Sequence, residues 1–207
     1  MRALTILAAA AASAALPMAA GAAGNAVTLY GGYRGGGGFT AQASGQALDL
    51  ESSGALSASL DFAMDTSRQY QLFVSYQDSK IPNFTGSGGS SASSQSLPMS
   101  VTYLHVGGTN FFDGPIGKGP YVVGGFGATL FQPSMSGYSS EWRPSMNIGI
   151  GYQWPLGESL ALRVEARGYL TLINSESSLF CSGGCVVNIK GDAFTQGEAL
   201  IGLSARF

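Results

Sequence analysis

His105 is the only histidine of the chain and is therefore the first candidate for acid–base chemistry. It lies in the middle of the segment Val101–Gly107. A histidine that acts as a base needs a nucleophile within hydrogen-bond reach. The alternative is a packed or interfacial side chain. We favour that alternative, because no carboxylate pair in the sequence stands out as an acid/base set, and we predict that the protein is not an enzyme.

Cys181 and Cys185 are the only two cysteines, and they flank Ser-Gly-Gly. They could form a disulfide, ligate a metal or act as a redox pair. A metal site of this kind usually has four ligands, and no histidine or third cysteine lies nearby. Gly183 and Gly184 would supply the flexibility that a tight disulfide loop needs. Which chemistry applies depends on the redox compartment.

The first residues indicate the compartment. Met1–Arg2 gives a positive start, an apolar stretch runs from Ala3 to Leu16, and small residues occupy Ala19–Gly24. This order is typical of a secretory signal peptide, which we place at residues 1–23. A retained anchor is the alternative, but the apolar run is shorter than the ~20 residues of a spanning helix. Residues 24–207 then form one exported domain, in which a disulfide between the two cysteines is expected.

The composition is unusual for a soluble domain. Charged residues make up 11% of the chain, whereas about 25% is typical. A net charge of −2 and only ten Lys and Arg residues argue against a nucleic-acid partner. Gly35–Gly38 lacks the Gly-Lys-Ser/Thr ending of a phosphate-binding loop, so we interpret it as a flexible loop. We predict no cofactor and no metal.

Alternation of apolar and polar residues with a period of two predicts eight strands. It is clearest in Met146–Trp154, Leu160–Leu172, Leu56–Phe62 and Tyr70–Gln77. The weaker expected strands are Ala26–Arg34, Pro98–Phe112, Tyr121–Phe131 and Ala193–Phe207, and in the second and third of these the two faces are hard to tell apart.

The connections between these strands alternate strictly in length. The short ones are Met64–Arg68, Asp113–Gly119 and Pro155–Ser159, and the long ones are Gly35–Ser53, Lys80–Leu97, Gln132–Trp142 and Asn174–Asp192. Transmembrane barrels have short periplasmic turns and longer extracellular loops. The fold predicted is therefore all-β: an eight-stranded antiparallel up-and-down transmembrane barrel in the outer membrane, with both termini in the periplasm.

The two faces of such a barrel have different expected roles. Aromatic side chains near the short-turn ends would form one interfacial girdle; they are Phe62, Tyr70, Phe111, Phe112, Tyr121, Trp154 and Phe207. Tyr76, Phe131, Trp142 and Phe194 would form the other. The lumen would hold a paired charge network of Asp61, Arg163, Glu165, Arg167, Glu198 and Arg206. We interpret this network as a structural plug; a gate for ions or protons is the alternative.

The C-terminal segment Ala199–Phe207 looks like the insertion signal of bacterial outer-membrane proteins. Phe207 is the terminal aromatic, and Leu203 and Ile201 are the apolar residues at alternate positions before it. With the export signal and the strand count, the chain resembles the small eight-stranded outer-membrane barrels, such as the OmpA transmembrane domain, OmpX and OmpW. The stretch from Glu165 to Cys181 also resembles uncharacterised outer-membrane β-barrel domain proteins of Gram-negative bacteria.

The resemblance implies fold and location and no ligand. Expected partners are outer-membrane lipid, lipopolysaccharide and, during insertion, the barrel-assembly machinery, with the mature protein a monomer. In the lipid A deacylases among such barrels a serine follows the histidine by two residues, and here that position is Gly107. The function expected is structural or surface interaction with a plugged lumen. The alternatives are a narrow channel for small or hydrophobic solutes, a lipid A-modifying enzyme and a soluble periplasmic barrel.

Overall fold

The computed structural model describes residues 24–41, 47–84, 95–134, 139–173, 178–179, 187–190 and 193–207. The signal peptide expected at residues 1–23 and the disulfide expected between Cys181 and Cys185 lie outside the described residues. Across the described segments, no helix is both long and apolar enough to span a membrane.

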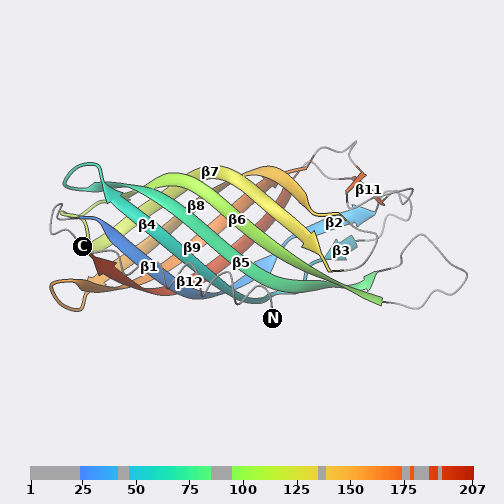
Figure 1. The fold of residues 1–207 in the computed structure, drawn as a ribbon, viewed down its shortest axis with the longest axis horizontal. Helices are drawn as coiled ribbons and strands as arrows, with labels where there is room; N and C mark the ends of the chain where they lie inside the picture. Colours follow the sequence, from blue (N-terminus) through green and yellow to red (C-terminus); the bar gives the residue numbers. More distant parts are fainter. Residues whose placement is uncertain are drawn as a thin grey trace, which may run out of the picture.

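Eight strands form a closed antiparallel barrel (Figure 1), which confirms the predicted fold. They are β1 (Ala26–Gly36), β4 (Ser53–Ala63), β5 (Arg68–Phe84), β6 (Gln95–Phe111), β7 (Gly119–Pro133), β8 (Glu141–Pro155), β9 (Leu160–Leu172) and β12 (Ala193–Arg206). Each barrel strand pairs with the next, and β12 pairs with β1. Closure matters because an open sheet would leave the backbone groups of its edge strands unpaired.

Asn25 secures the seam where the first and last strands meet. Its backbone oxygen accepts a hydrogen bond from the Phe207 N–H at 3.1 Å, and its side-chain oxygen accepts one from the Ala63 N–H at 3.0 Å. One residue therefore ties the start of β1 to both of its neighbours, β12 and β4. This is the end of the barrel with the short connections 64–67, 112–118 and 156–159, called the short-turn end below.

A second, four-stranded sheet lies at the opposite, long-connection end (Figure 1) and was not predicted. Its strands are β2 (Gly38–Ala41), β3 (Ala47–Asp49), β10 (Ser178–Leu179) and β11 (Val187–Lys190). The interpretation of Gly35–Gly38 as a loop was wrong, because Gly35 and Gly36 end β1, Gly38 begins β2, and only Gly37 lies between the two strands. Each strand is too short to show alternation, and β2 pairs with β11 from a distant part of the chain.

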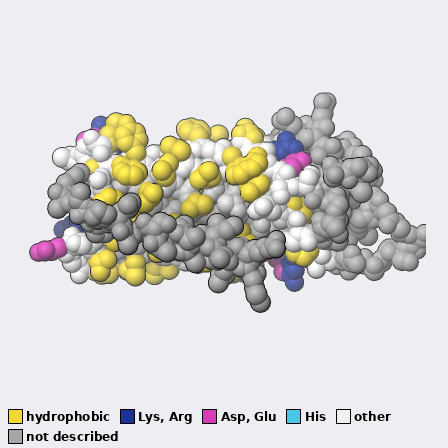
Figure 2. Space-filling view, viewed as in Figure 1, with side chains coloured by type: hydrophobic (Ala, Val, Ile, Leu, Met, Phe, Trp, Pro, Cys, Tyr) yellow, Lys and Arg dark blue, Asp and Glu magenta, His cyan; other side chains and the backbone are white. Residues whose placement is uncertain are grey.

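The outer face of the barrel is apolar. On β12, Ile201 and Leu203 are 57% and 58% exposed, whereas Leu200, the residue before Ile201, points inward and is 3% exposed. Figure 2 shows hydrophobic side chains over the body of the barrel and charged ones toward its two ends. Large exposed residues continue around the wall: Leu29, Leu56, Leu60, Leu72, Leu104, Val106, Phe126, Ile148 and Ile150. Soluble monomers rarely expose so much contiguous apolar surface, and hydrocarbon is its natural solvent.

The lumen is filled by side chains in successive layers. Phe111, Tyr121 and Val123 form an apolar cluster near the short-turn end, with Ile116 of the β6–β7 turn packed against it. Buried charged and polar residues occupy the middle. A larger apolar cluster lies toward the long-connection end. An eight-stranded barrel is just wide enough for such filling.

Candidate functional site: the charge network in the lumen

Asp61 on β4 and Arg163 on β9 form an ion pair across the lumen. The Arg163 Nη1 and Asp61 Oδ2 atoms are 2.9 Å apart, and both side chains are almost completely buried. Arg163 also donates to the Gln153 side-chain oxygen at 2.8 Å and to the Tyr30 hydroxyl at 3.1 Å. Asp61 accepts further hydrogen bonds from Ser59 and Gln71. Such bonds satisfy the charges, which is necessary because an unpaired buried charge is costly.

Glu165 and Arg167 form a second pair two residues apart on β9, where alternation directs both inward. The Arg167 Nη2 and Glu165 Oε1 atoms are 2.6 Å apart. The Tyr121 hydroxyl donates to Glu165 at 2.9 Å. Gln71 joins this pair to the first, because it donates to Asp61 at 2.7 Å and accepts from Arg167 at 3.1 Å. The Arg167 guanidinium lies over the Phe73 ring, 3.6 Å from its centroid.

Arg34 and Glu198 form the third pair, toward the long-connection end of the barrel. The Arg34 Nη2 and Glu198 Oε2 atoms are 3.3 Å apart, and both side chains are fully buried. The Tyr169 hydroxyl donates to Glu198. The guanidinium of Arg34 lies 4.8 Å from the ring centroid of Tyr103 and 5.2 Å from that of Tyr169. These rings partly replace water around the cation.

The structure places five of the six predicted network residues inside the barrel, and adds Arg34. In the sequence, the first expected strand ended at Arg34, before a run of glycines, and Arg34 was left out of the network. The signal that could have found it is parity: Thr28 and Tyr30, six and four residues earlier on β1, are also buried. Three acids and three arginines therefore still balance, with Arg34 as the third cation.

Arg206 was wrongly assigned to this network. Its guanidinium donates to the backbone oxygens of Gly157 and Glu158, at 3.1 and 2.7 Å, in the β8–β9 turn. Arg206 has the same parity as buried Ser204, but it is the last residue of β12. It therefore lies beyond the end of the packed lumen and caps turn carbonyls instead.

The predicted girdle needs a similar correction. Phe62, Tyr70 and Trp154 are outward and 42–56% exposed, whereas Tyr121 is fully buried in the lumen. Tyr121 packs inside because Gly151 on the adjacent strand has no side chain; a Cβ there would overlap the Tyr121 ring. Three further girdle candidates are also buried: Phe111, Phe131 and Phe194. Two of these, like Tyr121, come from the strands whose faces were ambiguous in sequence.

His105 is buried in the lumen, and its Nε2 atom lies 2.9 Å from the Ser145 hydroxyl oxygen. The contact spans β7, because Gly127 is the register partner of both residues. Gly107 could hold no serine, since a Cβ there would overlap the Gly124 backbone oxygen. Within the described residues, no carboxylate bonds to His105, and no group of three His, Cys, Asp or Glu side chains could hold a metal ion.

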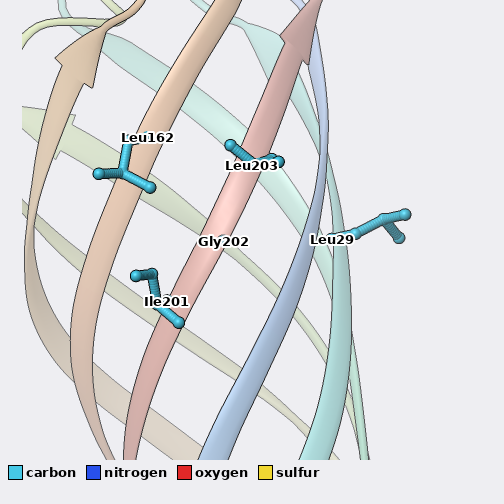
Figure 3. Close-up of a pocket in the computed structure, with 5 residues that line it drawn as sticks. All are labelled: Leu29, Leu162, Ile201, Gly202 and Leu203. Atoms are coloured by element: carbon cyan, nitrogen blue, oxygen red, sulfur yellow. The ribbon is translucent and has the colours of Figure 1, made fainter.

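The residues expected to form the insertion signal lie at the end of β12. Ile201 and Leu203 project outward, and Phe207 follows the strand; their part in insertion stays a prediction. Ile201, Gly202 and Leu203, together with Leu29 and Leu162, line a shallow apolar pocket across β1, β12 and β9 (Figure 3). The pocket lies on the apolar outer face and contains no polar side chain that could select a ligand.

The fold is that of the eight-stranded outer-membrane barrels. Neisserial surface protein A shares it at 13% identity and a TM-score of 0.52, over 90% of this chain and 99% of that one. The Pseudomonas aeruginosa proteins OprG (11% identity, TM-score 0.47, 90% and 98% covered) and OprF, through its N-terminal barrel (13%, 0.46, 90% and 100%), are less similar in shape. No protein-family model matches the sequence, and no curated protein matches it.

Proposed function

We propose that this protein is a sealed outer-membrane barrel that serves a structural or surface-interaction role and conducts no ions. One observation carries the proposal: among the described residues, three fully buried ion pairs occupy the lumen between two apolar clusters, and Gln71 joins two of the pairs by hydrogen bonds. A conducting pore needs a continuous path of water or exposed polar groups. In this protein, side chains fill the lumen instead. The barrel therefore presents its long connections without opening a path through its interior.

The location in this proposal is the bacterial outer membrane, with both termini on the periplasmic side. The apolar outer face and the shared fold support the location, and the short turns, which lie at the same end of the barrel as the start of β1 and the end of β12, support the orientation. Partners follow from the location: outer-membrane lipid and lipopolysaccharide around the wall, and the barrel-assembly machinery during insertion. The protein is proposed to work as a monomer.

The proposal includes no catalytic activity. His105 and Ser145 are 1% and 6% exposed, so substrate has no evident approach to the only histidine. A triad would also need a group that orients the imidazole, and the Nδ1 atom of His105 has no hydrogen-bond partner among the residues that the structure describes. Expression of the protein should leave the lipid A mass spectrum unchanged; a shifted mass that His105→Ala abolishes would show an enzyme.

Planar-bilayer recording tests the sealed barrel. Purified protein, shown to be folded by faster gel migration before boiling, is expected to give no discrete conductance steps. The control is Arg163→Ala/Asp61→Ala, which removes one whole ion pair and so opens polar space without leaving an unpaired charge. If the wild type gives conductance steps, and if neutralising the charge of Arg163 or Glu165 alters them, the protein is the narrow channel and this proposal is wrong.

A further inference from the structure

The strands of the barrel are tilted, so residues that pair side by side lie at different heights above the short-turn end (Figure 1). A circuit of register partners from Ala26 returns to β1 at Gly36, ten residues further along, and it passes through Asp61, Gln71, Gly107, Gly125, Asn147, Tyr169 and Gln196. With ~3.3 Å per residue along a strand and a tilt of about 40°, each residue adds roughly 2.5 Å of height. Each of the eight steps in this circuit therefore climbs about 3 Å toward the long-connection end.

The apolar belt on the outer wall is tall on β8. Its outward side chains are apolar or aromatic from Trp154, beside the β8–β9 turn, to Trp142 near the long-connection end; between them lie Tyr152, Ile150, Ile148, Met146 and Pro144. Twelve residue steps separate the two tryptophans, which corresponds to a belt about 30 Å tall.

The belt is short on β4, which lies diametrically opposite β8 in the strand order. Its large outward side chains run from Met64, in the turn after the strand, to Leu56, a distance of eight residue steps or about 20 Å. On neighbouring β5 the outward apolar series ends at Tyr76, the register partner of Leu56, and the next outward residue is the exposed Asp78. The Tyr76 hydroxyl donates a hydrogen bond to the Asp78 carboxylate.

Polar contacts mark the edge of the belt that is nearer the long connections on this side of the barrel. The hydroxyl of Tyr33, on β1, donates to the Ser52 backbone oxygen at 3.2 Å. Lys80 and Glu51 form an ion pair 3.4 Å apart, in which both side chains are about half exposed. Tyrosines with polar partners are typical of the membrane–water interface. On β1, β4 and β5 the hydrocarbon edge therefore lies at the level of Tyr33 and Tyr76.

The two sides of the barrel differ in height only at the long-connection end. Trp142 lies three register steps, about 9 Å, above Tyr76 along the series Tyr76, Thr102, Leu130 and Trp142. By the same count, Trp154 and Met64 lie within about 3 Å of each other at the short-turn end. A rigid tilt of the barrel moves both edges of a belt together, so it cannot make the short belt match the tall one.

We propose that the protein thins the membrane on one side: the leaflet nearer the long connections is compressed beside β1, β4 and β5, which we call the thin face, and keeps its full height beside β8. A belt shorter than the hydrocarbon layer is matched by thinning of the bilayer. The partner that fits the thin face is lipid with short or disordered acyl chains. This inference rests on the outer-membrane location in the proposed function and goes beyond it.

Depth-dependent quenching of single tryptophans tests the thin face. Tyr33→Trp and Met146→Trp, each with Trp142 and Trp154 replaced by phenylalanine, lie on the thin face and on β8, within about 1 Å of the same height by the register count. A flat bilayer would therefore bury them to the same depth. In vesicles, we expect lipid brominated near the headgroup to quench Tyr33→Trp more than lipid brominated near the chain ends does. The order should be reversed for Met146→Trp, a difference in depth of several ångströms.

Leu60→Trp and Tyr152→Trp, in the same phenylalanine background, are the matched control pair. They lie toward the short-turn end of the two faces, at heights that differ by about 3 Å, and should show the same depth. Faster gel migration before boiling shows that each variant is folded.

Three results would overturn the thin face. Equal depths for Tyr33→Trp and Met146→Trp would show a flat bilayer and leave the membrane location intact. A shift in the control pair equal to that in the upper pair would show a rigid tilt of the barrel. Quenching of all four variants by aqueous iodide and by neither brominated lipid would contradict the outer-membrane location itself, and the thin face with it.

Discussion

Glu198 on the last strand is the direct register partner of Arg34 on the first strand, and the two side chains form a fully buried ion pair where the barrel closes. On its other side, Glu198 is the register partner of Arg167. The Glu198 carboxylate therefore lies on a strand whose two neighbours each carry an arginine at the paired position. The closure of the sheet is reinforced by side chains in the lumen as well as by the backbone ladder.

Removing only one member of this pair should be more damaging than removing both. Glu198→Ala leaves a buried, uncompensated guanidinium and is expected to cost about 3–5 kcal/mol of unfolding free energy. The double variant Arg34→Met/Glu198→Leu replaces the pair with apolar groups of similar volume and should lose less than either single change. Urea unfolding of the barrel in lipid vesicles, followed by tryptophan fluorescence, measures all of them; a double variant less stable than Glu198→Ala would contradict this account.

The glycines where β6 and β7 meet should tolerate no side chain. In Gly127→Ala the new Cβ would overlap the Leu104 backbone oxygen, so strand pairing must shift, at a cost of about 1–3 kcal/mol or more. Gly31→Ala is the control, because nothing lies within 4 Å of a Cβ at that outward position. The folded fraction, read from gel migration without boiling, should fall for Gly127→Ala and not for Gly31→Ala.

The Asp65 turn should depend on acidity. Backbone donation from the Ser67 N–H, followed by the Arg68 side chain, lowers the pKa of Asp65 to about 2. Because the folded pKa lies below the ordinary value of 3.8, the stabilisation is complete above pH 3.8 and is lost as the pH falls toward 2. A carbon-13 NMR titration of the carboxyl should give a midpoint near 2; a midpoint near 3.8 would mean that the turn does not hold the charge. In Asp65→Asn this acid dependence should disappear.

A charge on the outer wall should be costly only where lipid touches it. Ile148 is 73% exposed, so in a water-soluble protein Ile148→Arg would change stability little. In a bilayer it is expected to cost roughly 2–4 kcal/mol, the range for arginine at the midplane of a barrel. Ser96→Arg, on the exposed face of β6 at the long-connection end, should be neutral. Urea midpoints in vesicles compare the two, and a neutral Ile148→Arg would argue against lipid contact.

Alternation and connection length were enough to predict eight barrel strands, because lipid outside and packed side chains inside impose a strict period of two. The same rule placed Arg163, Glu165 and Arg167 in the lumen. It failed at Tyr121 for two reasons. A glycine-rich strand shows little contrast between its two faces, and the space that Tyr121 fills exists only because Gly151 on the neighbouring strand has no side chain. It failed at Arg206 because the alternation predicts whether a side chain points inward or outward, but not where along the barrel axis the packed lumen ends.

Contacts between distant strands could not be predicted. The contact between His105 and Ser145 depends on β7, which places Gly127 between them. The hydrogen bonds of Gln71 to two ion pairs depend on how the strands are staggered around the barrel. The small sheet at the long-connection end joins segments about 150 residues apart in sequence by only two register pairs. Such features follow from closure in three dimensions, which no local pattern encodes.

The central claim, that the apolar wall of the barrel faces hydrocarbon, is tested most directly by fluorescence quenching. Ile148→Trp, in a chain whose Trp142 and Trp154 are replaced by phenylalanine, places one fluorophore on the wall of β8. In vesicles, lipids brominated in their acyl chains should quench it strongly, and aqueous iodide should not. Quenching by iodide with none by brominated lipid would contradict the account.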